Sequence, residues 1–390
     1  MHVQSLVTSA LVVLAQGAST FALPAASVAA GKESESAAAH LESRSLNFDF
    51  SVYSAPQTCT NPIVRKEWRT LNPLEKLSFL AAVMCLQIVP AKTGNVYAGA
   101  KARYDDYQAL HIRMTDYVHF NGIFIPWHRY MLHMFETDLR NVCGYQGGIP
   151  YWDWTLDATS EANVLKSPIF DSFLGFGGNG PYIADTSGFP AEWKTNVPIP
   201  GRQGGGCITT GPFAWRQIPM GPANHTDYTP HCLRRDISPW LITQKGNASM
   251  LEFVMNATDF WDLDHRSEGL QLNVQGMTIH AAGHIGVGGE IGEMANTYSS
   301  PGDPLFWVHH SMIDRVWDSW QRKDFANRKT DIGGPDTMWA YPYNYFGDIP
   351  YQNITLNSDL IYPQMANSIK ISQVMDTKGG PLCYTYDKSA

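Results

Sequence analysis

The sequence predicts one mainly helical domain over residues 51–390, with a helical core, long loops and a few short strands. Three observations lead to this prediction. Several segments carry a helix cap followed by apolar residues at helical spacing. The stretch 156–239 is rich in glycine and proline, which is typical of long loops. No linker-like composition divides residues 51–390, so we expect one domain rather than several.

The composition excludes several classes of protein. The chain has 390 residues, 28 basic and 36 acidic side chains and a net charge of −8. A nucleic-acid-binding protein usually has a basic excess, so no nucleic-acid partner is expected. Hydrophobic residues make up 44% of the chain and charged residues 16%, which favours a folded core. No internal apolar run is long enough to predict a membrane span, and no feature implies a partner protein.

The N-terminus predicts export. Residues 6–15 form a short apolar run, LVTSALVVLA, where a secretory signal peptide has its apolar region. We assign residues 1–22 to a signal peptide. Residues 23–50 are rich in Ala, Ser and Glu and are interpreted as a flexible linker or pro-segment. The mature protein is therefore expected to be secreted.

Cysteines and glycosylation sequons agree with export. The six cysteines contain no CxxC pair, which argues against a zinc–thiolate site. An even number in an exported chain predicts disulfides, for which 15 full pairings exist. One pairing would join Cys59 to Cys85 and tie the N-terminal strand to the first helix. N-glycosylation is predicted at four Asn-x-Ser/Thr sequons, those of Asn224, Asn247, Asn256 and Asn353.

The expected helices follow in order along the chain. The first begins at Asn72-Pro73, where a capping residue precedes a first-turn proline, and Pro90 ends it. The last begins in the same way at Asp303-Pro304 and runs to about residue 325. Helices are also expected at 100–118, 126–140 and 250–259. After residue 332 the pattern predicts turns and short strands.

Eight of the 13 histidines fall in two windows. They are His111, His119, His128 and His133 in the first window, and His280, His284, His309 and His310 in the second. His280 and His284 are four residues apart, so on a helix they share one face and can bind one ion. Each window can supply three imidazoles from two facing helices, which is how a helix bundle builds a metal site.

The donor set narrows the choice of metal. No cysteine or carboxylate lies at ligand spacing beside these histidines, whereas di-iron and di-manganese bundles use carboxylates. Sites made only of imidazole suit zinc, copper, iron or nickel. Two matched three-histidine sites favour a pair of coppers that bind dioxygen between them. Zinc with open coordination positions remains an alternative.

Two long motifs resemble a known family. The stretch 119–136, HFNGIFIPWHRYMLHMFE, resembles the copper A signature of tyrosinases and related polyphenol oxidases. The stretch 303–314, DPLFWVHHSMID, resembles their copper B signature. The segments PYWDW at 150–154 and YTY at 384–386 are also similar to the family. The resemblance covers about residues 59–386 and implies a four-helix bundle holding two coppers, with 51–390 as the catalytic domain.

The resemblance implies a role for each histidine. Copper A would be bound by His111, His119 and His128, and copper B by His280, His284 and His310. The family ligand lies four residues before the signature aspartate, which selects His310. Two adjacent residues cannot both face one site from a helix, so His309 is expected to support or pack beside it. His133 is expected to pack away from the site.

The resemblance also implies supporting residues. Asp314 is expected to pair with Arg129 and brace the two ligand helices. Phe306 is four residues before His310, where its ring can stack on ligand imidazoles. Together with Phe306, Ala281 and Ile285 are expected to line the substrate pocket, with Ile285 at its mouth.

Two departures from the family pattern bear on activity. Many fungal tyrosinases have a cysteine two residues before the second copper A histidine, linked by a thioether to a ligand, but Tyr117 stands here. Many tyrosinases also have an Asn after the first copper B histidine, which with a nearby Glu holds a water that deprotonates a monophenol. Here that residue is Ala281, and Glu268 and Gln271 are the upstream candidates. We therefore expect weak monophenol hydroxylation.

The resemblance implies a copper oxidoreductase, a tyrosinase or catechol oxidase. It would use dioxygen to oxidise o-diphenols to o-quinones, with ortho-hydroxylation of monophenols left open. The expected partner is a small phenolic substrate. Three alternatives remain: a tailoring oxidase of a phenolic secondary metabolite, a haemocyanin-like oxygen carrier and a dizinc hydrolase. Because only Asp387–Ala390 follow the YTY segment, no C-terminal lid over the site is expected.

Overall fold

The computed structural model describes residues 51–55, 59–195, 197–271, 273–340, 342–344 and 348–390. The expected signal peptide (1–22) and linker (23–50) lie outside these residues. The helices of four or more residues are α2 (Ser51–Ser54), α3 (Pro73–Leu86), α4 (Arg103–Val118), α5 (Phe124–Asn141), α6 (Glu161–Leu165), α7 (Pro239–Lys245), α8 (Ala248–Met255), α9 (Phe260–Glu268), α10 (Ile279–Gly288), α11 (Leu305–Lys323) and α12 (Phe325–Arg328). Among the described residues, none of these helices is long and apolar enough to cross a membrane.

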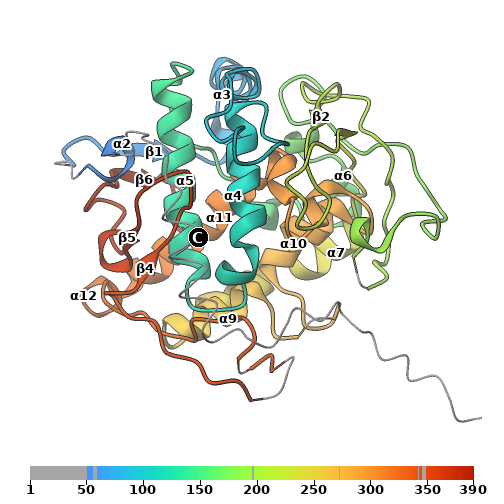
Figure 1. Cartoon of the computed structure of the whole chain (residues 1–390). Helices are drawn as coiled ribbons and strands as arrows, with labels where there is room; N and C mark the ends of the chain where they lie inside the picture. Colours follow the sequence, from blue (N-terminus) through green and yellow to red (C-terminus); the bar gives the residue numbers. More distant parts are fainter. Residues whose placement is uncertain (1–50, 56–58, 196, 272, 341, 345–347) are drawn as a thin grey trace, which may run out of the picture. The chain divides into compact units, whose positions relative to one another are not determined.

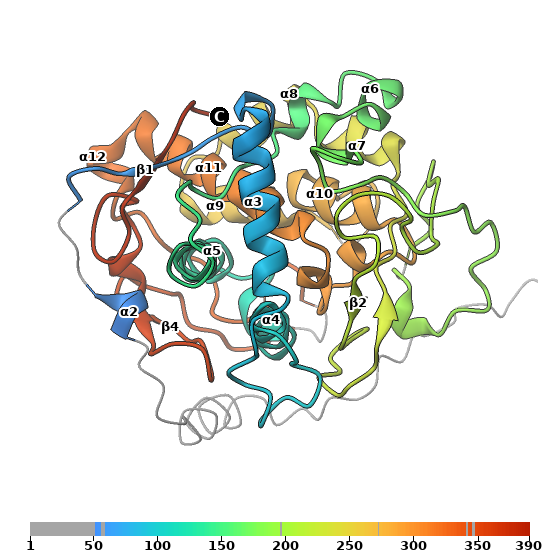
Figure 2. The same ribbon diagram turned by 90° about the horizontal axis from the view of Figure 1, so that it is seen from above.

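Four helices form the centre of the fold. Helices α4 and α5 pack side by side, α11 packs on α5, and α10 packs on α11. Figure 2 looks down α4 and α5, with α3 lying beside them. Aromatic rings fill the space between these helices, and Phe135 of α5 stacks on Trp307 of α11 with ring centroids 3.6 Å apart. The predicted mainly helical fold is confirmed.

Local signals start the helices where the sequence predicts. The Asn72 side chain accepts hydrogen bonds from the backbone N–H groups of Leu74 and Glu75, and the Glu75 carboxylate accepts one from the Asn72 N–H. Asp303 likewise accepts from the Leu305 N–H at 3.0 Å, at the start of α11. Both predicted helix starts are therefore correct to within two residues.

The expected helix at 250–259 is wrong at its C-terminal end. Helix α8 stops at Met255, and α9 begins five residues later. Asp259 lies between them with an extended backbone, and its side chain accepts from the Asp262 N–H at 2.9 Å. This cap starts a second helix, and α9 itself was not predicted.

Three two-stranded sheets complete the described structure. Strand β1 (Ile63–Arg65) pairs in parallel with β6 (Tyr384–Tyr386), β2 (Gln217–Ile218) pairs with β3 (His231–Cys232), and β4 (Asp359–Leu360) pairs with β5 (Ile369–Lys370). The β1–β6 pair brings the residues near 63–65 and 384–386 together, and Ile63 lies opposite Tyr384.

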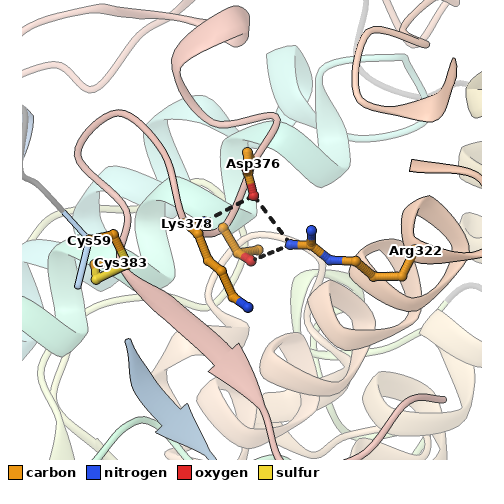
Figure 3. The surroundings of a disulfide bond; sticks show 6 residues. Cys59, Arg322, Asp376, Lys378 and Cys383 are labelled. Carbon is orange, nitrogen blue, oxygen red and sulfur yellow. Dashed lines mark hydrogen bonds and ion pairs between the residues drawn. A yellow bond between two sulfur atoms is a disulfide. The ribbon is translucent and has the colours of Figure 1, made fainter. Parts of the chain in front are cut away.

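The disulfides differ from the pairing considered above. Cys59 bonds to Cys383 beside the β1–β6 pair, where Arg322 also binds Asp376 (Figure 3). Cys85, at the end of α3, bonds instead to Cys143. The Cys59–Cys85 expectation is wrong because β1 pairs with the C-terminal strand, which places Cys59 next to Cys383. The third bond, Cys207–Cys232, joins the long loops to β3.

Candidate metal centre

The first three histidines form one cluster. His111 lies on α4, His119 directly follows α4, and His128 lies on α5. Their side chains are 1%, 4% and 3% exposed, and their ring centroids are 5.0 to 5.7 Å apart. One nitrogen from each ring lies within 4.8 Å of the others, so all three can reach one ion.

The second cluster contains four histidines rather than three. His280 and His284 lie one turn apart on α10, and His309 and His310 lie on α11. One nitrogen from each of the four lies within 4.8 Å of the others. A His309 nitrogen thus lies as near as those of the three expected ligands, although the sequence analysis placed His309 beside the site.

The adjacent histidines reach the cluster from different sides. The His310 ring lies in the centre of the bundle, where it stacks on His128 at 4.4 Å and packs against Phe306 at 4.2 Å. The His309 ring lies directly against α10. There its Nδ1 faces the Trp154 Nε1–H at 3.3 Å, and a Cβ on Gly283 would fall 2.1 Å from the same nitrogen. His309 thus sits between α11 and α10, whereas His310 faces both clusters.

Backbone carbonyls orient four of the rings through Nδ1. The Nδ1 of His119 lies 2.9 Å from the Thr115 carbonyl, and that of His128 lies 2.8 Å from the Phe124 carbonyl. The Nδ1 atoms of His111 and His284 lie 2.7 and 2.9 Å from the carbonyls of Tyr298 and Met294. A carbonyl can only accept, so each Nδ1 carries the proton and each Nε2 presents a lone pair.

The Nε2 atoms of this centre need a partner that the protein does not supply. The Nε2 atoms of His111, His128 and His280 are buried and have no hydrogen-bond partner among the described residues. The Nε2 atoms of His284 and His310 face each other at 2.9 Å. Burying polar atoms without a hydrogen-bond partner costs free energy. The convergence of these nitrogens therefore indicates a site where the rings bind metal ions.

Burial keeps the imidazoles neutral. It lowers the pKa of His119 to about 4 and that of His284 to about 3, although a carbonyl hydrogen bond opposes the shift in each case. Burial, with the neighbouring imidazoles, lowers the pKa values of His111, His128, His280 and His310 as well. Neutral imidazole is the form that binds a metal, and the all-imidazole donor set fits copper or zinc.

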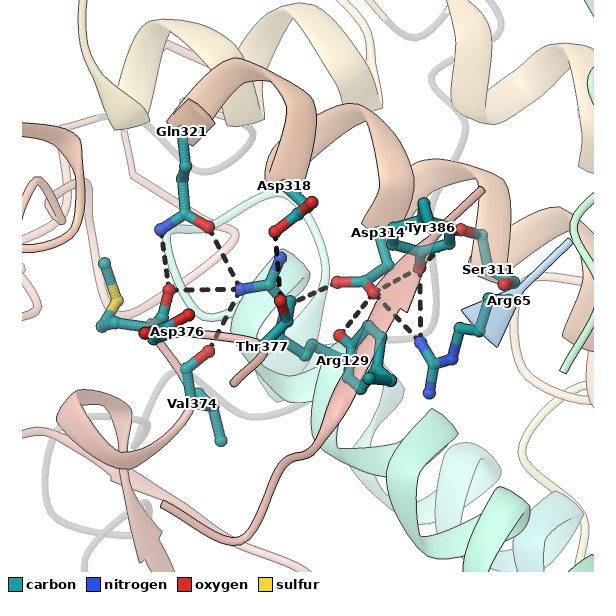
Figure 4. A network of polar contacts seen from close by, with 12 residues as sticks. Arg65, Arg129, Ser311, Asp314, Asp318, Gln321, Val374, Asp376, Thr377 and Tyr386 are labelled. Atoms are coloured by element: carbon teal, nitrogen blue, oxygen red, sulfur yellow. Dashed lines mark hydrogen bonds and ion pairs between the residues drawn. The ribbon is translucent and has the colours of Figure 1, made fainter. Parts of the chain in front are cut away.

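An ion-pair network joins α5 and α11 to the β1–β6 pair (Figure 4). Asp314 of α11 accepts from Arg129 of α5 and, at 3.1 Å, from Arg65 of β1. The hydroxyls of Tyr384 and Tyr386 also donate to Asp314. Burial raises the pKa of Asp314, but the charges of Arg129 and Arg65 outweigh it and hold that pKa below its ordinary value. The contact between Arg129 and Asp314 ties α5 to α11.

The expected pocket residues lie around the clusters. Phe306 is 1% exposed, and its ring centroid is 5.2 Å from that of His111 and 5.8 Å from that of His284. Ala281 is 9% exposed and Ile285 is half-buried, both beside the α10 ligands. Phe124, which the sequence analysis did not single out, lies 4.6 Å from the His280 ring and 4.8 Å from the His128 ring.

The other residues named in the sequence analysis differ in their burial and in their contacts. Glu268 is buried at the end of α9 and accepts from the Phe120 N–H at 2.7 Å, whereas Gln271 is exposed. Burial and the neighbouring Asp264 carboxyl raise the pKa of Glu268 well above its ordinary value. Tyr117 is 43% exposed. His133 bonds through Nε2 to the Tyr53 carbonyl at 3.0 Å and takes no part in either cluster.

Sequence reasoning missed the residues that orient the rings. Thr115 and Phe124 each lie four residues before the histidine they hold, so helical spacing could have identified them. Met294 and Tyr298 act through their backbone carbonyls, which leave no signal in a single sequence. Gly283 is visible only once α10 is known to touch His309.

Two imidazole clusters converging inside a helix bundle have the arrangement of a dinuclear metal site. The family model of the common central domain of tyrosinase matches residues 101–323. The chain therefore belongs to the tyrosinase family, whose members are oxidoreductases with a pair of coppers.

Two relatives and one solved structure show the extent of the similarity. The chain is 32% identical to Tyrosinase P of Aspergillus terreus, over 84% of this chain and 93% of the relative. It is 35% identical to N-acetyl-6-hydroxytryptophan oxidase of Emericella nidulans, over 86% of this chain and 96% of that relative. A polyphenol oxidase variant from Thermothelomyces thermophila has a similar structure. The TM-score is 0.72 at 30% identity, and the match covers 92% of this chain and 96% of that one.

Proposed function

We propose that this chain is a dicopper oxidase that converts o-diphenols to o-quinones with dioxygen. His111, His119 and His128 would hold copper A, and His280, His284 and His310 would hold copper B. The observation that carries the proposal is the convergence of the histidine rings, with the buried Nε2 atoms of His111, His128 and His280 lacking a hydrogen-bond partner among the described residues. Membership of the tyrosinase family supports copper over zinc.

The residues around the centre have distinct tasks in this proposal. A copper pair held by the six histidines would supply redox chemistry, in which two o-diphenols give four electrons to one dioxygen and form two o-quinones and two waters. Phe306 packs against His111 and His310 and limits the rotation of both rings. Ile285, half-buried beside His284, offers an apolar edge to a neutral aromatic ring. Arg129 and Asp314 hold α5 and α11 at a constant spacing.

Ala281 favours diphenols as substrates. A monophenol must lose a proton whose pKa is about 10, and a positioned base or water speeds such a step by about 100- to 10,000-fold. Ala281 offers no polar group to hold a water. The buried Glu268 has one oxygen committed to the Phe120 N–H. Gln271 is exposed and offers no replacement.

Copper analysis and a substrate panel test the proposal. Purified protein should contain about two coppers per chain. It should oxidise catechol faster than tyrosine or tyramine, with a lag on the monophenols. Zinc in place of copper, or no turnover of any catechol, would contradict the proposal. Equal rates on a monophenol and its catechol would contradict the argument from Ala281, which Ala281→Asn tests directly by raising the monophenol rate.

A tailoring oxidase is the second candidate. The relative that is 35% identical is named as an oxidase of N-acetyl-6-hydroxytryptophan. Its name indicates that some members of the family act on substrates larger than simple phenols. Adding N-acetyl-6-hydroxytryptophan and methoxyphenols to the panel separates the two candidates. A strong preference for one of these over catechol would assign a tailoring role.

We also propose that the protein is secreted and glycosylated. All six cysteines are in disulfides, which persist in oxidising compartments. Asn224, Asn256 and Asn353 are exposed. Asn247 is half-buried, and its side-chain amide donates to the Thr243 carbonyl while its oxygen caps α8. Glycopeptide mass spectrometry of protein from the culture medium should find glycans on the first three and not on Asn247.

A further inference from the structure

One short segment contacts both histidine clusters. The segment Glu293–Ser299 supplies the Met294 carbonyl to His284 Nδ1 at 2.9 Å and the Tyr298 carbonyl to His111 Nδ1 at 2.7 Å. By contrast, His119 and His128 are held by carbonyls four residues earlier in the chain, at the spacing of a helical turn. The orientation of His111 and His284 therefore depends on a separate piece of chain. We call it the 293–299 segment.

A buried carboxylate anchors this segment. Glu293 is 4% exposed, and its Oε1 accepts from the Gln108 Nε2 at 3.3 Å. The same Gln108 nitrogen donates to the Ser299 carbonyl at 3.1 Å. Gln108 thus binds both ends of the 293–299 segment, and it lies three residues before His111 on α4.

A histidine from the long loops pairs with the other oxygen of this carboxylate. His231 of β3 directs its Nε2 to Glu293 Oε2 at 3.1 Å and its Nδ1 to the Thr229 carbonyl at 2.8 Å. Both ring nitrogens face acceptors, which fits a protonated ring with two donors. The next residue, Cys232, is cross-linked to Cys207. A cation outside the bundle is therefore held in place beside Glu293.

We propose that Glu293 is a positioning residue for both halves of the centre. It holds the 293–299 segment so that the Met294 and Tyr298 carbonyls orient one imidazole in each cluster at the same time. His231 contributes by fixing the carboxylate from the loop side. The inference rests on the ligand assignment of the proposed function. It adds that one residue, which binds no copper, controls the affinity of both sites together.

The test compares two Glu293 variants with a matched control. Glu293→Gln keeps the shape and loses the charge, and Glu293→Ala loses both. Groups that orient metal-binding histidines typically change metal affinity by about 10- to 100-fold. We expect Glu293→Ala to weaken both copper sites by that factor and Glu293→Gln to do so less. Glu290→Gln is the control. It lies three residues earlier and binds Thr186 and the Ile199 N–H rather than Gln108, so its copper affinity should not change.

Two measurements separate positioning from general stability. Copper per chain is measured after dialysis against a graded series of chelator concentrations, and melting temperature is measured with and without copper. A positioning role predicts a smaller copper-induced rise in melting temperature, because the stabilisation by a bound ligand grows with the logarithm of its affinity. A merely structural role predicts a lower melting temperature of the copper-free protein with an unchanged rise.

Several results would overturn the inference. These are wild-type copper affinity in Glu293→Ala, loss of one copper with the other unchanged, or an equal effect in Glu290→Gln. If Glu293→Ala does not fold, Gln108→Met removes the shared donor and should lower copper affinity at both sites; unchanged affinity would again overturn the inference. A wild-type chain that binds no copper would instead show that the ligand assignment of the proposed function is wrong.

Discussion

At the proposed copper B site, the neighbours His309 and His310 differ in what surrounds them. The His310 ring lies between His128 and Phe306, with its Nε2 at 2.9 Å from that of His284. The Nδ1 of His309 accepts a hydrogen bond from the Trp154 Nε1–H at the α10 surface. A helix separates successive side chains by about 100°, so one of the pair reaches the bundle centre and the other packs between helices.

This difference predicts unequal effects of removing the two side chains. His310→Ala should lose one copper per chain and nearly all oxidase activity, because it removes a ligand atom. His309→Ala should keep more copper, because it removes packing and a contact to Trp154. Metal analysis of purified variants checks this. His133→Ala, a buried histidine outside both clusters, is the control and should keep two coppers. The reverse order for His309 and His310 would mean that His309 is the ligand.

At the scale of elements, the approach of α10 to α11 sets the second cluster. Gly283 is the contact point, since a Cβ there would lie 2.1 Å from His309 Nδ1. His280 and His284 stand on either side of it along α10. The absence of a side chain at one position therefore determines how close the α10 ligands come to those of α11.

Gly283→Ala should damage this site. The methyl group must push α10 away from α11, and such overpacking typically costs about 1 to 3 kcal/mol of folding free energy. We expect a matching loss of stability in urea unfolding and loss of copper from the second site first. Gly178→Ala is the control, because no heavy atom lies within 4 Å of its Cβ position. Full copper content in Gly283→Ala would show that the helices do not need this close contact.

The contact of the long loops with the bundle predicts a pH-dependent stability. Burial lowers the pKa of His231, but its hydrogen bond to Glu293 and the charge of Glu293 outweigh this, so the pKa is raised despite the nearby Arg234. A raised histidine pKa stabilises the fold fully below the ordinary value of about 6.5 and loses that effect as pH rises through the folded value.

His231→Gln should therefore destabilise the copper-free protein more at pH 6 than at pH 9. The measurement is the melting temperature of the wild type and of His231→Gln across this pH range. In a Glu293→Gln background, the loss of melting temperature caused by His231→Gln should depend little on pH, because the charged partner of His231 is gone. A gap between the two melting temperatures that widens with rising pH would contradict the pairing of His231 with Glu293.

At the scale of the whole molecule, one arginine joins the β1–β6 pair to the bundle. Arg65 of β1 is fully buried and binds both oxygens of Glu136 on α5, and it also binds Asp314 on α11. Its guanidinium lies 3.6 Å from the Tyr384 ring centre. The Cys59–Cys383 bond cross-links the same region across 324 residues.

Arg65→Met should strongly destabilise the fold. Removing one partner of a buried ion pair typically costs about 3 to 5 kcal/mol, because the other charge stays buried without compensation. In this variant the Glu136 carboxylate would stay buried without its arginine partner. Arg266→Met, which breaks a partly exposed pair with Asp262 on α9, should cost about 1 kcal/mol or less. Equal urea midpoints for the two variants would contradict the central role given to Arg65.

Local sequence is enough to predict the helical class, the helix starts at Asn72 and Asp303, the candidate ligands and the family. These features depend on residues close together in the chain, where spacing and caps act locally. The tertiary structure alone decided the disulfide partner of Cys59, the entry of His309 into the second cluster and the carbonyls of Met294 and Tyr298 that orient two rings. These contacts join segments far apart in sequence or act through backbone atoms that every residue has. Their identity therefore depends on the path of the folded chain and not on local pattern.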